Sequence, residues 1–373
     1  MTNILIMCFG KAGAGPGFTL AMGQGFIEAG FNVYYIVSNQ VENKNEWDRL
    51  INNGTNVLYL DTGNRKSFIK KTIHFLVFDK KKIVNFLEHN KIDVSIQTFV
   101  HPWMNVINHW INPKHKMAIV HDPKIHTGES IINATLATLQ YRYISEMIVL
   151  TKSFIPIICK EYGKDERNIY YMRHGIFDSY QNYISIPEKL IFDQNATNYL
   201  FFGRIEEYKG ISVLLEAYSI LKRENPNITL TIAGSGNVNK YSEKFSHLED
   251  FLLINRYISD NEIGSLFSGP NVVLVLPYID ATQSGVIPVA IDFNVPIIAS
   301  ESGGLKEQLN DGKLGLFAKP GEVISLKNQM KIVTNKNVME EQKKLEREFR
   351  KELQWKEIAK KFMDTLKNNS TNR

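Results

Sequence analysis

Residues 201–210 read FFGRIEEYKG, and this stretch decides the fold that we expect. An apolar strand ends at Gly203-Arg204, and Lys209 stands directly before a segment with helical apolar spacing. A guanidinium, an ammonium and a helix N-terminus all favour negative charge at the same place, so the stretch predicts a diphosphate site. The plain alternative is a surface loop in which Arg204 and Lys209 pair with the two neighbouring glutamates.

Two further strand ends follow along the chain. TIAGSG at 231–236 runs from a strand into a glycine turn, and INRYISDNEI at 254–263 leaves a strand and enters a capping box, Ser259 with Glu262. Parallel strands present their carboxyl ends at one sheet edge, where open α/β sheets bind ligands. The glycine turn at Gly234 is unremarkable alone. Exposed backbone amides and carbonyls at the second strand end, near Arg256 and Tyr257, could read the flat edge of a base.

A fourth loop, DATQSGVIPVAIDF at 280–293, places a glycine-centred turn between a predicted strand and a helix-compatible segment. Its only carboxylates, Asp280 and Asp292, stand at its two ends. The neutral side chains between them can form hydrogen bonds with a polar ligand. We expect Asp292, on the helix, to be solvated.

The order FGRIEEYKG, IAGSG, RYISDNEI, PYIDATQSG, VPIIASESGGLKEQLNDGKLG resembles the C-terminal half of GT-B glycosyltransferases, particularly retaining family 4. The resemblance covers residues 198–318, and the segment around Trp355 resembles the family's last helix. It implies an α/β fold of GT-B type, with two Rossmann-like domains facing across a cleft and a C-terminal helix crossing back to the first. We expect a first domain at 1–180, a second at 181–348 and the returning helix at 349–373.

The resemblance implies a nucleotide-sugar donor, a UDP- or GDP-sugar, held mainly by the second domain. Arg204 and Lys209 match the family's diphosphate pair. Other positions match donor-binding groups of the family, by backbone or side chain. These are Gly203, Gly234, Arg256, Tyr257, Ile258, Thr282, Gln283, Ser284, Gly285, Val286 and Ile287. The family's two glutamates, eight positions apart, fall on Ala281 and Val289, so both carboxylates are absent and Asp280 becomes the candidate substitute.

The first half of the chain alternates β-rich runs with helix-period segments, as a parallel sheet with crossover helices does. The predicted strands of this half are 4–8, 33–37, 57–60, 94–98, 117–120, 147–150 and 169–172. Those of the second half are 199–202, 229–233, 252–254, 272–276 and 296–299. The loop FGKAGAGPG at 9–17 could bring the amides of Gly13 and Gly15 close to a ligand, with a tight structural turn as the alternative.

KMAIVHDPKIH at 116–126 ends a predicted strand with His121. The resemblance implies that this histidine lies beside the transferred sugar, where a neutral imidazole could bind a sugar hydroxyl; the alternative is a histidine that caps the strand end. Asp122, His126 and Glu129 are weaker acceptor-side candidates. No D-x-D motif occurs, so we expect no required metal or other cofactor, with Arg204 and Lys209 neutralising the diphosphate instead.

The composition of the 373-residue chain fits a globular protein, with 43% hydrophobic and 22% charged residues. A formal net charge of +5 is mild at this length and predicts no nucleic-acid partner. Two cysteines, Cys8 and Cys159, are too few for a disulfide framework and suit a reducing compartment. No signal peptide or membrane-spanning run is evident, so we expect a cytoplasmic protein that could lie at the inner face of a membrane.

One region is locally basic. Residues 65–91 hold eight lysines or arginines against two acids, a local charge of 8 − 2 = +6, interleaved with four phenylalanines. This stretch predicts peripheral contact with anionic lipid headgroups. The alternative is a solvated helix pair whose phenylalanines, Phe68, Phe75, Phe78 and Phe86, lie in the core.

These patterns together favour a retaining, metal-independent glycosyltransferase that extends a surface glycan or a lipid-linked oligosaccharide. A GT-B sugar-nucleotide epimerase is a second hypothesis, although the loop at 281–289 lacks acid/base carboxylates. A third is a non-catalytic protein that binds a sugar nucleotide or glycan in an assembly complex.

Overall fold

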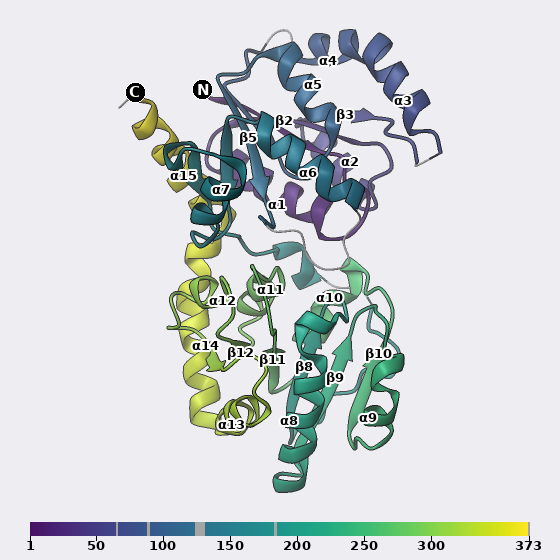
Figure 1. Cartoon of the computed structure of the whole chain (residues 1–373), viewed down its shortest axis with the longest axis vertical. Helices are drawn as coiled ribbons and strands as arrows, with labels where there is room; N and C mark the ends of the chain where they lie inside the picture. Colours follow the sequence, from purple (N-terminus) through teal and green to yellow (C-terminus); the bar gives the residue numbers. More distant parts are fainter. Residues whose placement is uncertain (65, 88–89, 124–130, 183–184, 372–373) are drawn as a thin grey trace. The chain divides into compact units, whose positions relative to one another are not determined.

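The computed structural model describes residues 1–64, 66–87, 90–123, 131–182 and 185–371 (Figure 1). The chain divides into two compact units, one formed by Met1–Gly175 with Gln354–Arg373 and the other by Ile176–Leu353. Each unit contains one parallel sheet with helices. This is the GT-B arrangement of two Rossmann-like sheets that the sequence motifs predict.

The first unit has a seven-stranded parallel sheet in the order β3-β2-β1-β4-β5-β6-β7. Each of the seven strands overlaps a predicted one, so the sequence-based assignment of this sheet is confirmed. The strands are β1 (Asn3–Cys8), β2 (Asn32–Ser38), β3 (Asn56–Leu60), β4 (Val94–Gln97), β5 (His115–Val120), β6 (Glu146–Val149) and β7 (Ile169–Tyr171). The order reverses at β1, whose two neighbours are β2 and β4, and ligands of open α/β sheets bind at such a switch point.

Helices connect these strands. They are α1 (Ala14–Glu28), α2 (Lys44–Asn52), α3 (Phe68–His74), the π-helical turn η1 (Phe75–Asp79), α4 (Lys80–Leu87), α5 (Pro102–Ile111), α6 (Ile131–Tyr143) and α7 (Phe154–Tyr162). The last helix of the chain, α15 (Trp355–Thr371), also belongs to this unit and packs on α1. Gly25 makes the contact possible, because a Cβ there would lie 2.3 Å from the Cβ of Trp355.

The second unit has a six-stranded parallel sheet in the order β10-β9-β8-β11-β12-β13. Its strands are β8 (Thr197–Phe202), β9 (Ile228–Ala233), β10 (Phe251–Ile254), β11 (Val272–Leu276), β12 (Ile297–Ser300) and β13 (Leu316–Ala318). Five of them match predicted strands; the sixth, β13, is a three-residue edge strand that apolar patterning did not mark. The order reverses at β8, which lies between β9 and β11.

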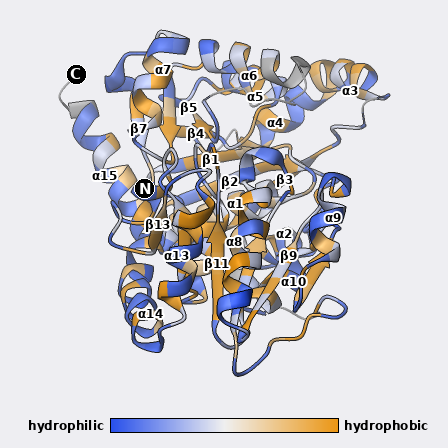
Figure 2. Ribbon diagram, turned by 60° about the horizontal axis from the view of Figure 1, so that its bottom comes forward, coloured by the Kyte–Doolittle hydropathy of each residue, from blue (hydrophilic) through white to orange (hydrophobic). Residues whose placement is uncertain are grey.

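The helices of the second unit follow the same alternation. They are α8 (Ile211–Glu224), α9 (Ser242–Ser246), α10 (Asp260–Phe267), α11 (Val286–Asp292), α12 (Leu305–Gln308), α13 (Val323–Val333) and α14 (Lys336–Arg350). In both units the strands are mainly hydrophobic, whereas the helices carry both hydrophobic and hydrophilic residues (Figure 2). The strands β1 and β11 are almost wholly buried, as expected for central strands of parallel sheets covered on both faces.

The C-terminal segment differs from the single helix expected from residue 349 onward. Helix α14 ends at Arg350, a 3₁₀ turn spans Lys351–Leu353, and α15 begins at Trp355. The interruption coincides with the passage of the chain from one unit to the other at 353/354. Leu353 and Trp355 are both buried, each in its own unit, and a continuous helix would not separate them in this way.

Candidate active site

The carboxyl edge of the second sheet is built from closely packed glycine turns. Gly203 follows β8 and Gly234 follows β9. Gly234 has φ +143°, and a Cβ on it would lie 1.9 Å from the carbonyl oxygen of Gly203. The two turns therefore pack backbone against backbone, and side chains at either position would separate them.

Lys209 lies at the centre of this edge. A Cβ on Gly203 would lie 3.1 Å from its Nζ, so the ammonium sits beside the glycine turn. Lys209 Nζ donates to the hydroxyl of Tyr278 over 3.2 Å and lies 4.8 Å from the centre of that ring. Because an ammonium only donates, the Tyr278 oxygen accepts and its own proton can go to Ser284 Oγ, 3.3 Å away.

Gln308 holds the next link. Its Oε1 accepts from the Ser284 amide over 2.8 Å, and its Nε2 donates to the Ser284 carbonyl over 3.2 Å. Lys209, Tyr278, Ser284 and Gln308 thus form one hydrogen-bonded series that joins the turn before α8, the loop after β11 and helix α12. Sequence reasoning found Lys209 and Ser284 but missed Tyr278 and Gln308. Both lie within motifs quoted for the family resemblance, but neither residue type marks a binding site by itself.

The turn before α8 is fixed against the end of β11. Gly210 is buried with φ +68°, and a Cβ there would lie 1.9 Å from the carbonyl oxygen of Pro277. The Tyr208 carbonyl accepts from the Ile279 amide over 2.7 Å. The loop that carries Lys209 and the loop that carries Ser284 are therefore joined through the backbone as well as through side chains.

The 280–287 loop has an exposed and a buried part. Asp280 is exposed, so it does not turn inward in this structure as a substitute for the missing glutamate. Ala281 is buried, and the carbonyl of Thr282 accepts from the Gly304 amide over 3.1 Å. The half-buried Gln283 and the exposed Gly285 complete the turn.

The amides at the start of α11 already have acceptors within the loop. The Val286 amide donates to Ser284 Oγ and the Ile287 amide to the Ser284 carbonyl, each over 3.4 Å. These bonds are long, so a phosphate oxygen could replace them at little cost. Ser284 is thus connected both to the Lys209 series and to the helix start.

The two arginines of the expected donor site differ. Arg204 is exposed, directly after Gly203. Arg256 is held by Glu262, with Nη2 to Oε1 at 2.6 Å, and this ion pair lowers the pKa of Glu262 to about 2. The predicted capping box at Ser259 is present. Arg256 therefore acts first as a partner of the α10 N-terminus, while the neighbouring Tyr257 is 49% exposed and Ile258 is buried.

The simple ion-pair alternative for 201–210 does not describe the structure. Glu207 Oε2 accepts from Lys240 Nζ over 3.0 Å, and Lys209 contacts Tyr278 instead of either glutamate.

The expectation that Asp292 is solvated was wrong. This carboxylate is 2% exposed and binds Arg350 Nη2 at 2.7 Å and Gln181 Nε2 at 2.9 Å, because it lies where α11 packs on α14.

The first unit positions His121 at the carboxyl end of β5. Its Nε2 donates to the Thr98 carbonyl over 2.8 Å, which leaves Nδ1 as the acceptor nitrogen of the neutral ring. The ring stacks on Phe99 with centroids 4.2 Å apart, and Phe99 lies against Gly15, where a Cβ would be 3.1 Å from its ring. Burial lowers the pKa of His121 to about 4, so the imidazole is neutral at pH 7.

A second histidine, not predicted as functional, lies near the first. His174 is buried, donates from Nδ1 to the Gly175 carbonyl over 2.9 Å, and has a pKa lowered to about 4 by burial. Phe18 contacts both imidazoles, each with centroids 5.1 Å apart. No sequence spacing connects 121 with 174, so only the fold reveals this pair.

The remaining first-unit candidates are less closely connected. Gly13 is the N-cap residue of α1, with φ +77°. Asp122 directly follows His121 and is half-buried. His126 and Glu129 lie outside the described residues. No group of three or more histidine, cysteine, aspartate or glutamate side chains suited to a metal ion occurs within the ranges that the structure describes.

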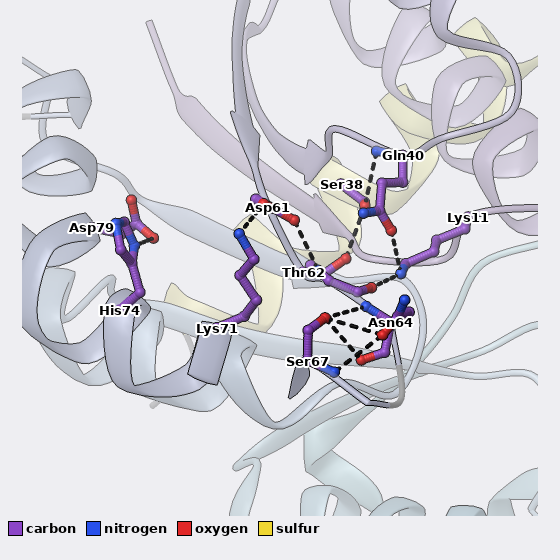
Figure 3. A network of polar contacts seen from close by, with 11 residues as sticks. Lys11, Ser38, Gln40, Asp61, Thr62, Asn64, Ser67, Lys71, His74 and Asp79 are labelled. Atoms are coloured by element: carbon purple, nitrogen blue, oxygen red, sulfur yellow. Dashed lines mark hydrogen bonds and ion pairs between the residues drawn. The ribbon is translucent and has the colours of Figure 1, made fainter. Parts of the chain in front are cut away.

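A polar network joins the ends of β1, β2 and β3 (Figure 3). Lys11 Nζ donates to Gln40 Oε1 over 2.5 Å and to the carbonyl of Gly63. Beside it, Ser38 Oγ and Thr62 Oγ1 are 2.9 Å apart. This network closes the edge of the sheet on the side away from β5 and continues into α3.

Residues 183–352 match the family model described as glycosyl transferases group 1. The second unit belongs to the group 1 glycosyltransferases. This group 1 unit contains Lys209, Tyr278, Ser284 and Gln308, and with the first unit it forms a GT-B fold.

Individual proteins resemble the chain to different extents. Lipopolysaccharide 1,2-N-acetylglucosaminetransferase of Salmonella typhimurium is 24% identical over 49% of this chain, and the match spans about half of that protein, 51%. An uncharacterized glycosyltransferase of Methanocaldococcus jannaschii is 23% identical over 82% of this chain and 83% of its own length. The Anabaena protein HepE, in complex with UDP-glucose, superposes with a TM-score of 0.64 at 15% identity, covering 100% and 98% of the two chains.

No helix in the described part of the chain is long and apolar enough to cross a membrane.

Proposed function

We propose that the protein is a retaining glycosyltransferase that moves a sugar from a nucleotide-sugar donor to a growing surface glycan or lipid-linked oligosaccharide. The observation that carries the proposal is the position of Lys209 in a group 1 unit. Its ammonium lies beside the Gly203 turn and is hydrogen-bonded to Tyr278. A half-buried cation at the switch point of a parallel sheet suits a diphosphate.

The donor diphosphate would bind along this edge. Arg204 is exposed and next in sequence to Gly203, so its guanidinium can swing onto a phosphate without breaking an ion pair of the described residues. Tyr278 and Ser284 would bind the phosphate oxygens or sugar hydroxyls that reach past Lys209. Gln308 would keep Ser284 in position through its two hydrogen bonds.

The chemistry needs charge stabilisation more than a protein nucleophile. The bond between the sugar anomeric carbon and the phosphate oxygen breaks with its electron pair on the leaving diphosphate, where Arg204 and Lys209 stabilise the new charge. The acceptor hydroxyl forms its bond to the same face of the anomeric carbon, and its proton passes to the departing phosphate oxygen. Configuration is thereby retained, and the two cations supply the neutralisation that a metal gives at other diphosphate sites.

His121 of the first unit would bind a hydroxyl of the transferred sugar. With Nε2 donating to Thr98, its Nδ1 is the nitrogen that can accept from a hydroxyl. A pKa of about 4 keeps the ring neutral, so it would interact through a hydrogen bond and not as a charged imidazolium. Asp280, exposed beside the buried loop, would contact the acceptor or the sugar from the solvent side.

The choice of donor and acceptor is supported by relatives. The solved Anabaena protein holds UDP-glucose, which favours a UDP-sugar over other nucleotides. The Salmonella relative is named for transfer of N-acetylglucosamine to lipopolysaccharide, which favours a surface glycan as acceptor. Such an acceptor would be made at the cytoplasmic face of a membrane.

The decisive experiment replaces Arg204→Ala and Lys209→Ala together and measures release of UDP from UDP-glucose with a panel of glycan acceptors. We expect a loss of kcat/KM of about 10³-fold or more, because two charge-assisted contacts to the leaving group disappear. The matched control, Arg223→Ala with Lys313→Ala, removes two exposed cations of the same unit and should retain activity. Equal activity of both double variants would overturn the diphosphate site. The same assay with EDTA should be unchanged.

Two other functions make different predictions in this assay. An epimerase would convert the sugar nucleotide to an epimer without an acceptor and without releasing nucleotide. A non-catalytic binding protein would show nucleotide-dependent thermal stabilisation but no turnover with any acceptor. His121→Ala separates the transferase from the binding protein, since it should lower kcat about 100-fold while leaving nucleotide binding intact.

A further inference from the structure

The helical run that follows β3 has two apolar faces. Its inner face carries Phe75, which is fully buried and stacks on Trp103 with ring centroids 4.3 Å apart. Its outer face is exposed to solvent. The outer residues, with their exposed fractions, are Ile69 (76%), Ile73 (59%), Leu76 (48%), Val77 (62%) and Phe78 (64%). Only part of the apolar residues of this segment therefore lie in the core. Most of the phenylalanines expected in the core are at least half-buried, but Phe78 is exposed.

The exposed residues form a continuous stripe. Positions 69, 73, 76 and 77 are spaced i, i+4, i+7 and i+8, which places them on one side of a helix about 12 Å long. The π-helical turn at Phe75–Asp79 adds a residue to one turn. Within this turn, Leu76, Val77 and Phe78 are all exposed although they follow one another in sequence.

Lysines flank the stripe. Those exposed to solvent are Lys66, Lys70, Lys80, Lys81 and Lys82. Asp79 is the single acid of the described part of this run, 66–87, and it contacts His74 at 3.3 Å. An apolar stripe flanked by positive charges is complementary to a surface with anionic headgroups over an apolar layer.

Polar contacts connect the start of α3 to the edge of the sheet (Figure 3). Asn64 Oδ1 accepts from the Ser67 amide over 3.1 Å, and Ser67 Oγ accepts from the Asn64 amide over 2.9 Å, so the turn before α3 is closed on itself. Lys71 forms an ion pair with Asp61 at the end of β3. The helix is thus connected to the carboxyl edge of the first sheet through Lys71.

We infer that this outer face, Ile69, Ile73, Leu76, Val77 and Phe78 with the flanking lysines, docks on the surface of an anionic phospholipid bilayer. The aliphatic side chains would enter the boundary between headgroups and acyl chains, while the lysines contact lipid phosphates. Docking would hold the carboxyl edge of the first sheet at the lipid surface, where a lipid-linked acceptor is found. The docking itself does not depend on the proposed transferase activity.

The test is sedimentation of the full chain with phosphatidylcholine vesicles, with and without phosphatidylglycerol. The wild type should bind the anionic vesicles and bind neutral ones far more weakly. Lys70→Gln with Lys81→Gln should weaken binding about 25-fold, at roughly fivefold per lysine. Ile73→Ser with Val77→Ser should weaken it by about tenfold or more through lost apolar burial.

Matched controls lie in the second unit. Ile324→Ser with Ile332→Ser changes two aliphatic side chains of similar exposure, 58% and 44%, and Lys336→Gln with Lys344→Gln removes two exposed charges. Both controls should bind anionic vesicles like the wild type, and thermal melts verify that every variant folds. Failure of the wild type to bind anionic vesicles would refute the inference. A wild-type dimer in light scattering that Ile73→Ser with Val77→Ser dissociates would refute it too, since the stripe would then serve a second copy.

Discussion

At the carboxyl edge of the second sheet an ammonium group lies among hydroxyls, whereas at the edge of the first sheet two histidines lie among aromatic rings. Lys209 contacts Tyr278 in the former, and Phe18 contacts both His121 and His174 in the latter. The first arrangement keeps a permanent charge at the site. The second uses burial to keep titratable groups uncharged, since both histidines have a pKa near 4.

The difference follows from what surrounds each group. Lys209 remains partly exposed and hydrogen-bonded to a hydroxyl, so its ammonium is placed to contact a phosphate. The histidines are enclosed by aromatic rings, and this burial outweighs the backbone hydrogen bonds that favour a charged ring, so protonation is disfavoured. One edge is thus suited to bind an anion, and the other to bind neutral hydroxyls. The two units should also respond differently to substitution and to pH.

The largest effect is expected at the turn that positions Lys209. Gly210→Ala places a methyl group against the Pro277 carbonyl in a backbone conformation with φ +68°. We expect the second unit to lose about 4 kcal/mol of stability or more, because backbone must move to relieve the overlap. Hydrogen exchange should show faster exchange in the second unit alone.

Gly321→Ala is the matched control for this substitution. Gly321 lies in the same unit with φ +75°, but a Cβ there has nothing within 4 Å. Its expected cost is only the backbone term of about 1 kcal/mol. If the two variants lost equal stability, the close approach of Gly210 to the Pro277 carbonyl would not contribute to stability. The carboxyl edge of the second sheet would then be less tightly packed than the structure indicates.

The next effect concerns acid and the first unit. His174 has a pKa of about 4 in the folded chain and an ordinary value of 6.5, so the unfolded chain binds more protons in this window. Its contribution to stability is present above pH 6.5 and is lost as the pH falls toward 4. Between pH 7 and pH 5 the loss is about 2 kcal/mol.

His174→Phe should remove this acid sensitivity in part. Trp47, Trp103, Trp110 and Trp355 all lie in the first unit, so tryptophan fluorescence reports the unfolding of that unit. The variant should be less stable than the wild type at pH 7, because it lacks the hydrogen bond to the Gly175 carbonyl. It should lose less stability than the wild type between pH 7 and pH 5. A wild type and variant with parallel pH profiles would argue against a buried neutral His174.

The smallest effect concerns the second unit, where stability should fall as the pH rises, the opposite of the dependence expected for His174. Glu346 of α14 is fully buried, neither carboxylate oxygen has a hydrogen-bond partner among the described residues, and burial raises its pKa well above its usual range. Its contribution is most favourable when it is protonated and declines as the pH rises through the folded pKa. Glu346→Met should therefore stabilise the second unit by about 1 kcal/mol at pH 8 and by less at pH 5.

The control for this prediction is Glu348→Met on the same helix, whose side chain is exposed. It should change stability by less than about 0.5 kcal/mol at either pH. Urea unfolding followed by hydrogen exchange of the second unit measures both variants. A destabilised Glu346→Met variant at pH 8 would indicate that the carboxylate has a partner in solution and that the second unit is not sensitive to alkali.

Sequence reasoning succeeded where local pattern and physics coincide. The buried strands, from 4–8 to 296–299, are short apolar runs between turn residues. Lys209 and the glycine turns were found because they stand at strand ends. The short β13, the break at 351–354 and the burial of Asp292 were missed, since each depends on what a segment packs against.

The sequence by itself determined the two parallel sheets and the strand ends that carry the candidate donor site, because hydrophobic periodicity and turn chemistry act over a few residues. The GT-B class came from the resemblance of the ordered motifs to a known family. Only the tertiary structure decided which side chains meet. Lys209 reaches Tyr278 across 69 positions, and Ser284 reaches Gln308 across 24. It also decided that His121 is neutral and that Asp280 stays exposed, because burial and charge environment arise from contacts between segments that are remote in the chain.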